Sequence, residues 1–253
     1  MHEFLSTWYG LTIFILIDIV ALVAIIAIGY RFCFKRLFDI LLSCLCFLFT
    51  WPIFLWVFTR YKKYQKAGGE VDGFLRSAPA VGKKGKTVAI TCFQTLDKEG
   101  NLAGEYGKGL SERAYLYLPR LIDIFLGRAS FIGVSALKFQ DAAFLDDEQE
   151  ERYAAPIGIL SPVSKDKRGG DSAEILAEES AYAKNFSLFI DCKLFFSFLL
   201  SKIRGEKEEK PNVDYAKSLV EKEIITQAEY DSVLESAEQE AKEWQDARSK
   251  KDK

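Results

Sequence analysis

Two long apolar segments, separated by a short basic stretch, dominate the first quarter of the chain. The first covers residues 9–30 ("YGLTIFILIDIVALVAIIAIGY") and is long enough for one helix to span a bilayer. The residues "MHEF" before it contain no Lys or Arg, and the apolar run is longer than that of a signal peptide. We therefore predict a retained transmembrane helix.

Asp18 is the only charged residue in this first segment. An acid within a membrane helix commonly faces a partner helix or marks a functional position. The alternative is an acid near the interface that reaches the headgroups or stays protonated. Both interpretations stay open at this point.

The second apolar segment, residues 37–58, has basic residues on both sides. Positive residues favour the cytoplasmic side, so we expect the first helix to run from outside to inside. A straight second crossing would then export one basic cluster, whereas a segment that enters and returns leaves both inside. The basic residues are Arg31, Lys35 and Arg36 before the segment, and Arg60, Lys62, Lys63 and Lys66 after it.

Pro52 lies inside this second segment, where it removes one backbone donor and favours a kink. Trp51 and Trp56 are suited to the headgroup region of a membrane. We therefore predict a re-entrant helix that breaks at Trp51 and Pro52. An ordinary two-helix hairpin is the alternative.

After residue 66 the pattern changes to that of short β-strands separated by turns. In "VGKKGKTVAITCF", the Lys84-Gly85 pair predicts a turn that leads into a strand over residues 87–93. Apolar residues then recur at helical spacing between residues 110 and 125. Pro119 interrupts that spacing and predicts a kink or two short helices.

Residues 185–203 ("NFSLFIDCKLFFSFLLSKI") form a third apolar segment, which follows a loop at residues 164–172. The segment is short for a membrane span and contains Asp191 and Lys193. These features favour a helix that lies in the membrane interface. A buried core helix is the alternative.

The chain becomes strongly charged from Gly205 onward. Thr226 and Glu229 form a T-x-x-E capping box, which predicts the start of a helix. We expect a helical hairpin with a short helix at residues 214–222 and a longer one from residue 227 to about residue 248. Such a tail binds a partner or forms a solvated extension.

Composition narrows the range of functions. The net charge of −2 gives no electrostatic basis for nucleic-acid binding. The single histidine, His2, argues against histidine catalysis or a histidine metal site. The five cysteines contain no C-x-x-C pair and are interpreted as reduced packing residues.

These elements predict a membrane-associated α+β fold in four parts. The parts are an N-terminal transmembrane helix (1–30), a re-entrant helix-break-helix (31–66), a small cytoplasmic mixed domain with interfacial helices (67–204) and a charged C-terminal helical hairpin (205–253).

Four stretches occur in an order and spacing that are similar to those of one known family. They are "FKRLFDILLS" (34–43), "VGKKGKTVAITCFQTL" (81–96), "YLPRLIDIFLGRASFIG" (117–133) and "YAKNFSLFIDCKLFF" (182–196). Together they resemble the bacterial sugar transferase family, the monotopic polyprenyl-phosphate phosphoglycosyl transferases. The resemblance extends from about residue 31 to residue 201.

Members of this family transfer a sugar phosphate from a UDP-sugar to polyprenyl phosphate. An Asp takes the phosphosugar covalently, and a neighbouring Glu engages Mg²⁺ together with that Asp. The metal neutralises a pyrophosphate while it is cleaved. The resemblance implies a protein of the bacterial inner membrane whose main domain faces the cytoplasm.

The residues for that chemistry are replaced in this chain. With residues 118–119 and Gly127 as anchors, the family's Asp-Glu pair falls on Leu116 and Tyr117, which offer neither a nucleophile for phosphate nor a ligand for Mg²⁺. The Asp of the family's Gly-Asp-Met-Ser turn is matched by Arg128. The other positions where the family's phosphate-site residues are replaced are Ala80, Cys92, Gln94, Val134, Ser135 and Ala136.

The combined losses predict a catalytically inactive member that acts by binding. We expect no catalytic residues, metal or other cofactor, and no nucleic-acid partner. The expected partners are membrane lipid and an active phosphoglycosyl transferase or another glycan-assembly protein, in a homo- or hetero-oligomer. One alternative is an active, divergent transferase with Mg²⁺ and relocated carboxylates at Glu112 and Asp123. A further alternative is a membrane anchor that reuses the family fold.

Overall fold

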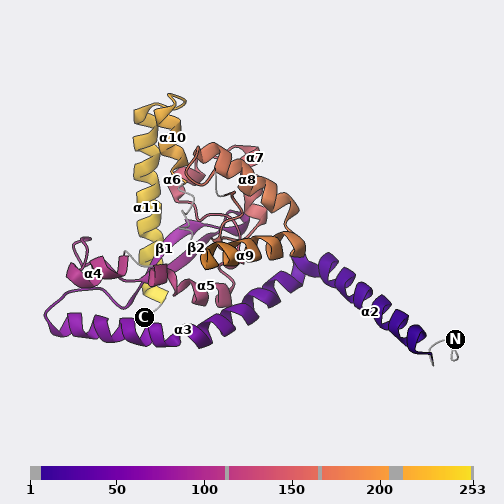
Figure 1. Ribbon diagram of the computed structural model, residues 1–253. Coiled ribbons are helices and arrows are strands. Elements are labelled where there is room, and N and C mark those ends of the chain that lie inside the picture. Colours follow the sequence, from indigo (N-terminus) through magenta and orange to yellow (C-terminus); the bar gives the residue numbers. More distant parts are fainter. Residues whose placement is uncertain (1–6, 112–113, 165–166, 205–212, 252–253) are drawn as a thin grey trace.

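Figure 1 shows the computed structural model of the chain, which describes residues 7–111, 114–164, 167–204 and 213–251. Two long helices, α2 (Trp8–Gly29) and α3 (Lys35–Lys66), are joined by a π-helical turn, η1 (Tyr30–Phe34). The remaining elements pack on one side of α3, and α2 extends away from them (Figure 1).

α2 makes little contact with the rest of the fold. Its side chains from residue 11 to residue 25 are all exposed, and Asp18 is among them. Both α2 and α3 are long and apolar enough to span a membrane. The prediction of an N-terminal helix of membrane-spanning length is confirmed, and its exposed apolar surface is suited to lipid.

The predicted break at Trp51 and Pro52 is wrong. α3 is one continuous helix from Lys35 to Lys66 with Pro52 inside it, and it bends part-way along its length (Figure 1). A proline removes one hydrogen bond, which bends a helix more often than it ends one. The re-entrant path and the hairpin alternative concern a membrane and stay predictions.

Two small sheets organise the domain. β1 (Leu75–Val81) pairs antiparallel with β2 (Thr87–Phe93), and the short helix η2 (Lys83–Gly85) joins them. β2 has the predicted bounds, and Lys84 in the predicted turn has a φ of 61°. β3 (Ser130–Ile132) pairs parallel with β4 (Gly158–Leu160).

The segment between the two sheets contains α4 (Gly104–Ser111), η3 (Ala114–Tyr117) and α5 (Arg120–Leu126). The predicted interruption at Pro119 is therefore confirmed as separate short helices. α5 ends at Gly127, whose φ of 85° is a left-handed conformation that favours glycine. An apolar core joins this segment to α3 and β2, and its members include Val57, Tyr61, Phe93 and Leu116.

The second half of the domain is mainly helical. Three short helices, α6 (Phe139–Ala142), α7 (Asp147–Glu150) and η4 (Glu151–Ala154), precede two longer ones, α8 (Ser172–Asn185) and α9 (Leu188–Ile203).

α9 corresponds to the third apolar segment and is not a fully buried core helix. One face is buried and includes Asp191 and Ser201, whereas the exposed side chains include Phe189, Phe196 and Ile203. An exposed apolar face of this kind is typical of a helix at a membrane interface, and that placement stays a prediction.

The C-terminal hairpin consists of α10 (Tyr215–Glu221) and α11 (Gln227–Lys251). The capping box is confirmed: the Thr226 N–H donates to the Glu229 carboxylate at 2.8 Å, and the Glu229 N–H donates to the Thr226 hydroxyl at 3.3 Å. α11 contacts α6, α10 and β1, so this tail packs against the domain.

Candidate functional site

The site where the sequence resemblance places phosphate chemistry lies where β2, η3 and α5 meet. Both η3 and α5 contact β2, and these three elements contain Leu116, Tyr117 and Cys92. Gln94 follows β2 directly and is buried. The fold therefore brings this group of predicted positions together.

Leu116 and Tyr117 have environments that exclude the role of an acidic pair. Leu116 is 8% exposed and belongs to the apolar core beneath the site. Tyr117 is half-buried, and the guanidinium of Arg120 lies 4.7 Å from the centroid of its ring. An aliphatic side chain and a phenol do not supply the carboxylate oxygens that Mg²⁺ prefers, so these residues do not fit the family's metal.

Asp123 is fully buried, and its carboxylate is hydrogen-bonded to a neighbouring strand. One of its carboxylate oxygens accepts a hydrogen bond from the Thr91 backbone N–H at 2.7 Å, and the other accepts from the Thr91 hydroxyl at 2.9 Å. The Arg128 guanidinium lies 3.4 Å from the same carboxylate. Asp123 therefore fixes α5 to β2 and has no surface available to a substrate.

The other carboxylate of the relocated-site alternative, Glu112, lies outside the described residues. Within the described part of the chain, no group of three or more His, Cys, Asp and Glu side chains could hold a metal ion. The prediction that the protein needs no metal stays a prediction.

A second group of predicted positions lies at the end of β3. Val134 forms a parallel bridge with Ile157 near β4, and Ala80 packs with Ile157. The close approach of the two strands explains the glycines here, because a Cβ on Gly133 would lie 2.1 Å from the Pro156 carbonyl oxygen. Ser135 and Ala136 continue from this point.

Ser135 is held by a buried ion pair that sequence reasoning missed. Arg152 and Glu179 are both fully buried and form an ion pair. The Ser135 N–H donates to Glu179 at 2.6 Å, and Arg152 donates to the Ser135 carbonyl at 2.7 Å. The turn at Ser135, one of the positions where the family's phosphate-site residues are replaced, is here fixed through its backbone.

A second buried network joins η1 and the start of α3 to the domain and was also missed. Lys35 at the start of α3 forms an ion pair with Asp191 of α9. The hydroxyls of Tyr30 and Tyr182 each donate to Asp191 at 2.7 Å, and Lys35 donates to the Ile132 carbonyl at 3.0 Å. Burial and the Asp191 charge raise the pKa of Tyr182. This network anchors α9 beside the junction of α2 and α3 (Figure 1).

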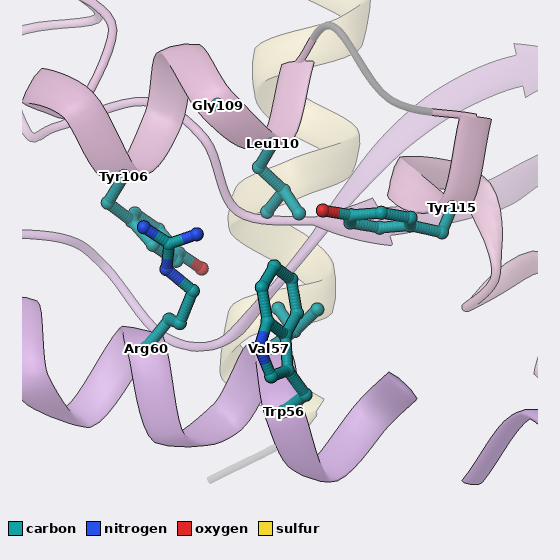
Figure 2. Close-up of a pocket in the computed structure, with 7 residues that line it drawn as sticks. All are labelled: Trp56, Val57, Arg60, Tyr106, Gly109, Leu110 and Tyr115. Atoms are coloured by element: carbon teal, nitrogen blue, oxygen red, sulfur yellow. The ribbon is translucent and has the colours of Figure 1, made fainter. Parts of the chain in front are cut away.

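Figure 2 shows a shallow pocket between α3, α4 and η3. The Arg60 guanidinium lies 5.1 Å from the Trp56 ring centroid, and Trp56 meets Tyr115 edge-on at 5.8 Å. Burial raises the pKa of Tyr106 to about 12. The lining combines aromatic rings with one arginine, and its described residues include neither a carboxylate nor a thiol. We assign it no chemistry.

An apolar groove lies between α3 and α5. Its lining residues are Ser43, Cys44, Phe47, Leu121, Ile122 and Phe125. Phe125 is 52% exposed, so the groove continues the exposed apolar surface of α3. This surface is suited to contact with lipid chains.

The chain was compared with curated proteins and with models of protein families. No curated protein matches the chain. The model of the bacterial sugar transferase family matches residues 30–205, which cover η1, α3, both sheets and the helices through α9. α2, α10 and α11 lie outside the match. The chain therefore belongs to the bacterial sugar transferase family.

Proposed function

We propose that this protein is a catalytically inactive member of its family, which acts as a membrane-bound partner or scaffold in bacterial glycan assembly. The observation that carries the proposal is the environment of Leu116. The residue at the position of the family's nucleophile is apolar and packs into the core. A side chain in that place has no group with which to take a phosphosugar.

The scaffold around this position is retained. The Asp39 carboxylate of α3 accepts a hydrogen bond from the Phe131 N–H of β3 at 3.1 Å, and Lys35 is bound to Asp191. These residues belong to stretches that resemble the family. A fold held by its buried polar contacts, without carboxylates at its reaction centre, supports binding rather than turnover.

The proposed location is the cytoplasmic face of the bacterial inner membrane. Exposed apolar side chains on α2, α3 and α9 support membrane contact. Two elements outside the family match, α2 with Asp18 and the hairpin of α10 and α11, are available to a protein partner. An active phosphoglycosyl transferase or another glycan-assembly protein is the partner that we propose.

The alternative function is an active transferase that uses a relocated carboxylate and Mg²⁺. Asp123 does not support it, because both of its carboxylate oxygens are bound to Thr91. Glu112 is then the carboxylate that must carry the activity. This makes the Glu112→Gln variant the test of the alternative.

The deciding experiment measures UMP release from pooled UDP-sugars by the full chain in lipid nanodiscs with Mg²⁺ and undecaprenyl phosphate. An active member of the family serves as the positive control. We expect no release above a protein-free sample. Release by the wild type that is lost in Glu112→Gln would overturn the proposal and establish the alternative.

A second experiment tests the partner. The chain is purified from its native membrane with mild detergent, and the proteins that accompany it are identified. We expect a glycan-assembly protein whose recovery falls when α2 is replaced by an unrelated transmembrane helix or when residues 213–251 are removed. Recovery of no such protein would contradict the scaffold role.

A further inference from the structure

We infer that α2 pairs with a transmembrane helix of another protein, and that Asp18 binds a lysine or arginine which that helix carries near the middle of the bilayer. The inference rests on the proposed function, because it states the chemistry by which the proposed scaffold holds its partner. Three observations carry it: the depth of Asp18 in α2, its lack of partners in the chain, and the absence of basic residues at that depth.

Asp18 lies at the middle of α2. It is ten residues from Trp8, where the helix begins, and eleven from Gly29, where it ends. At about 1.5 Å per residue, Asp18 is about 15 Å from either end, and the hydrocarbon core of a bilayer is about 30 Å thick. The aspartate side chain is too short to reach the headgroups from that depth.

Both ends of α2 have residues that fix its depth. Trp8 and Tyr9 are exposed at the N-terminal end, and such aromatic side chains favour the headgroup region. Just beyond the other end, Tyr30 is buried and its hydroxyl donates to Asp191 of α9 at 2.7 Å. Because these contacts hold both ends, α2 does not slide along its axis to bring Asp18 to the membrane surface.

The chain itself provides no partner for Asp18. α2 extends away from the domain (Figure 1), and every side chain from residue 11 to residue 25 is exposed. Within the part of the chain that the structure describes, Asp18 forms neither a hydrogen bond nor an ion pair. Thr12, by contrast, donates to the Trp8 carbonyl oxygen at 2.8 Å. An acid that faces lipid without a partner is costly, and a partner helix removes that cost.

A second copy of this chain does not offer the missing charge. Residues 8–30 contain no lysine or arginine, and the apolar segment at residues 37–58 contains one charged residue, Asp39, which is also an acid. Two copies of α2 side by side would place two carboxylates at the same depth, where like charges repel strongly. The cation must therefore come from a different protein.

The surroundings of Asp18 on α2 suit a helix–helix contact. Ile15, Ala21 and Leu22 lie one turn away on the same face. The small side chain of Ala21 lets another helix approach closely. The apolar neighbours provide surroundings of low dielectric constant, in which opposite charges attract more strongly than in water.

The test uses designed probe helices. The full chain carries a donor dye and is reconstituted in vesicles of neutral lipid with a Leu-Ala transmembrane helix that carries an acceptor dye. One probe has lysine at its centre, and the others have leucine, glutamine or glutamate there. We expect energy transfer to report association that is stronger by roughly tenfold or more with the lysine probe than with the leucine probe.

Substitutions then test Asp18 itself. Asp18→Leu and Asp18→Asn should both reduce association with the lysine probe to the level of the leucine probe, since neither side chain carries a charge. Asp18→Lys should reverse the preference, toward the glutamate probe. Thr12→Val is the matched control, because Thr12 is also a polar residue of α2 but its hydroxyl is bound within the helix. Its association should equal that of the wild type.

The native partner gives a second reading. The protein recovered with the wild type should be lost in Asp18→Leu, and one of its transmembrane segments should contain a lysine or arginine near its middle. Exchange of the two charges, with Asp18→Lys in this chain and an aspartate in the partner, should restore recovery. A partner that is recovered equally with Asp18→Leu would contradict the inference.

Three results with the probes would also overturn it. They are equal association with the lysine and leucine probes, full association of Asp18→Asn with the lysine probe, and energy transfer between two copies of the chain that is lost in Asp18→Leu. The second would make Asp18 a hydrogen-bonding group, and the third would assign it to self-association. UMP release by the wild type would overturn the proposed function alone. Loss of the lysine preference without UMP release would overturn this inference alone.

Discussion

The Asp123 carboxylate lies 3.4 Å from the Arg128 guanidinium, and the pair joins the first turn of α5 to the second residue after its end. The sequence resemblance places an Asp at the position of Arg128, so this chain carries a cation where the family has an acid. The buried Asp123 supplies the charge that pairs with this cation.

This pairing predicts the effect of breaking it. We expect Asp123→Asn to destabilise the folded protein by about 1–3 kcal/mol, because the Thr91 donors and Arg128 lose a charged acceptor. Arg128→Gln should cost less, since Arg128 is partly exposed. Apparent melting temperatures in nanodiscs measure both. The double variant should melt close to Asp123→Asn, and strictly additive losses would contradict the pairing.

The buried ion pair at the Ser135 turn predicts a larger effect. Glu179→Gln leaves the fully buried Arg152 without a counter-charge, which typically costs about 3–5 kcal/mol. The variant should show a much lower apparent melting temperature, or fail to accumulate in the membrane.

The neighbouring residue supplies the control for this prediction. Glu178 pairs with Lys167 at 2.9 Å, and both side chains are partly exposed. Glu178→Gln should change stability by no more than about 1 kcal/mol. Equal losses in Glu178→Gln and Glu179→Gln would show that burial does not decide the cost.

The elements that sequence predicted well are those with local signals. β2 follows a glycine turn, and α11 starts at a capping box, so residues within a few positions define each boundary. The assignment of the family's acidic pair to Leu116 and Tyr117 rests on the resemblance and stays a prediction; the structure shows that Leu116 packs in the apolar core. Pro52 was expected both to kink the helix and to break it, but α3 continues through it as one helix.

The buried polar contacts had no such signal. Arg152 and Glu179 are 27 residues apart in sequence, and each looks like a surface charge on a helix. Asp123 likewise stands in a helical pattern that gives no sign of its bonds to Thr91 in β2. Only the packing of α5 against β2 and of α8 against η4 reveals these partners, so they could not be predicted from spacing.

Asp141 gives a prediction about pH. One carboxylate oxygen accepts a hydrogen bond from the Ala216 N–H at the start of α10, at 3.0 Å, and the other has no partner among the described residues. Burial raises the pKa of Asp141, although the Lys138 charge opposes this and the Asp214 charge adds to it. The folded state therefore binds this proton more tightly than the unfolded state does.

The sign of the pH dependence follows. Protonated Asp141 stabilises the folded state at a pH below the pKa that the residue has in the unfolded chain, about 3.9. This contribution is lost as the pH rises from that value through the higher pKa of Asp141 in the folded state. Asp141→Asn resembles the protonated acid and escapes this loss. Its apparent melting temperature should match the wild type near pH 4 and exceed it at pH 7. A difference between the two proteins that does not vary with pH would contradict this assignment.

The path of α3 through the membrane predicts a labelling pattern. Single cysteines are placed at Ser6, Lys63 and Glu240 in a chain whose five native cysteines are replaced by alanine, and intact cells are treated with a membrane-impermeant maleimide. A spanning α2 followed by a re-entrant α3 should expose Ser6→Cys outside. It should leave Lys63→Cys and Glu240→Cys protected until the cells are permeabilised, because both basic clusters then stay in the cytoplasm.

If α3 instead crosses fully, Lys63→Cys and Ser6→Cys must label on the same side. The basic residues at one end of α3 would then be exported, and the bend in α3 would be a kink in an ordinary span.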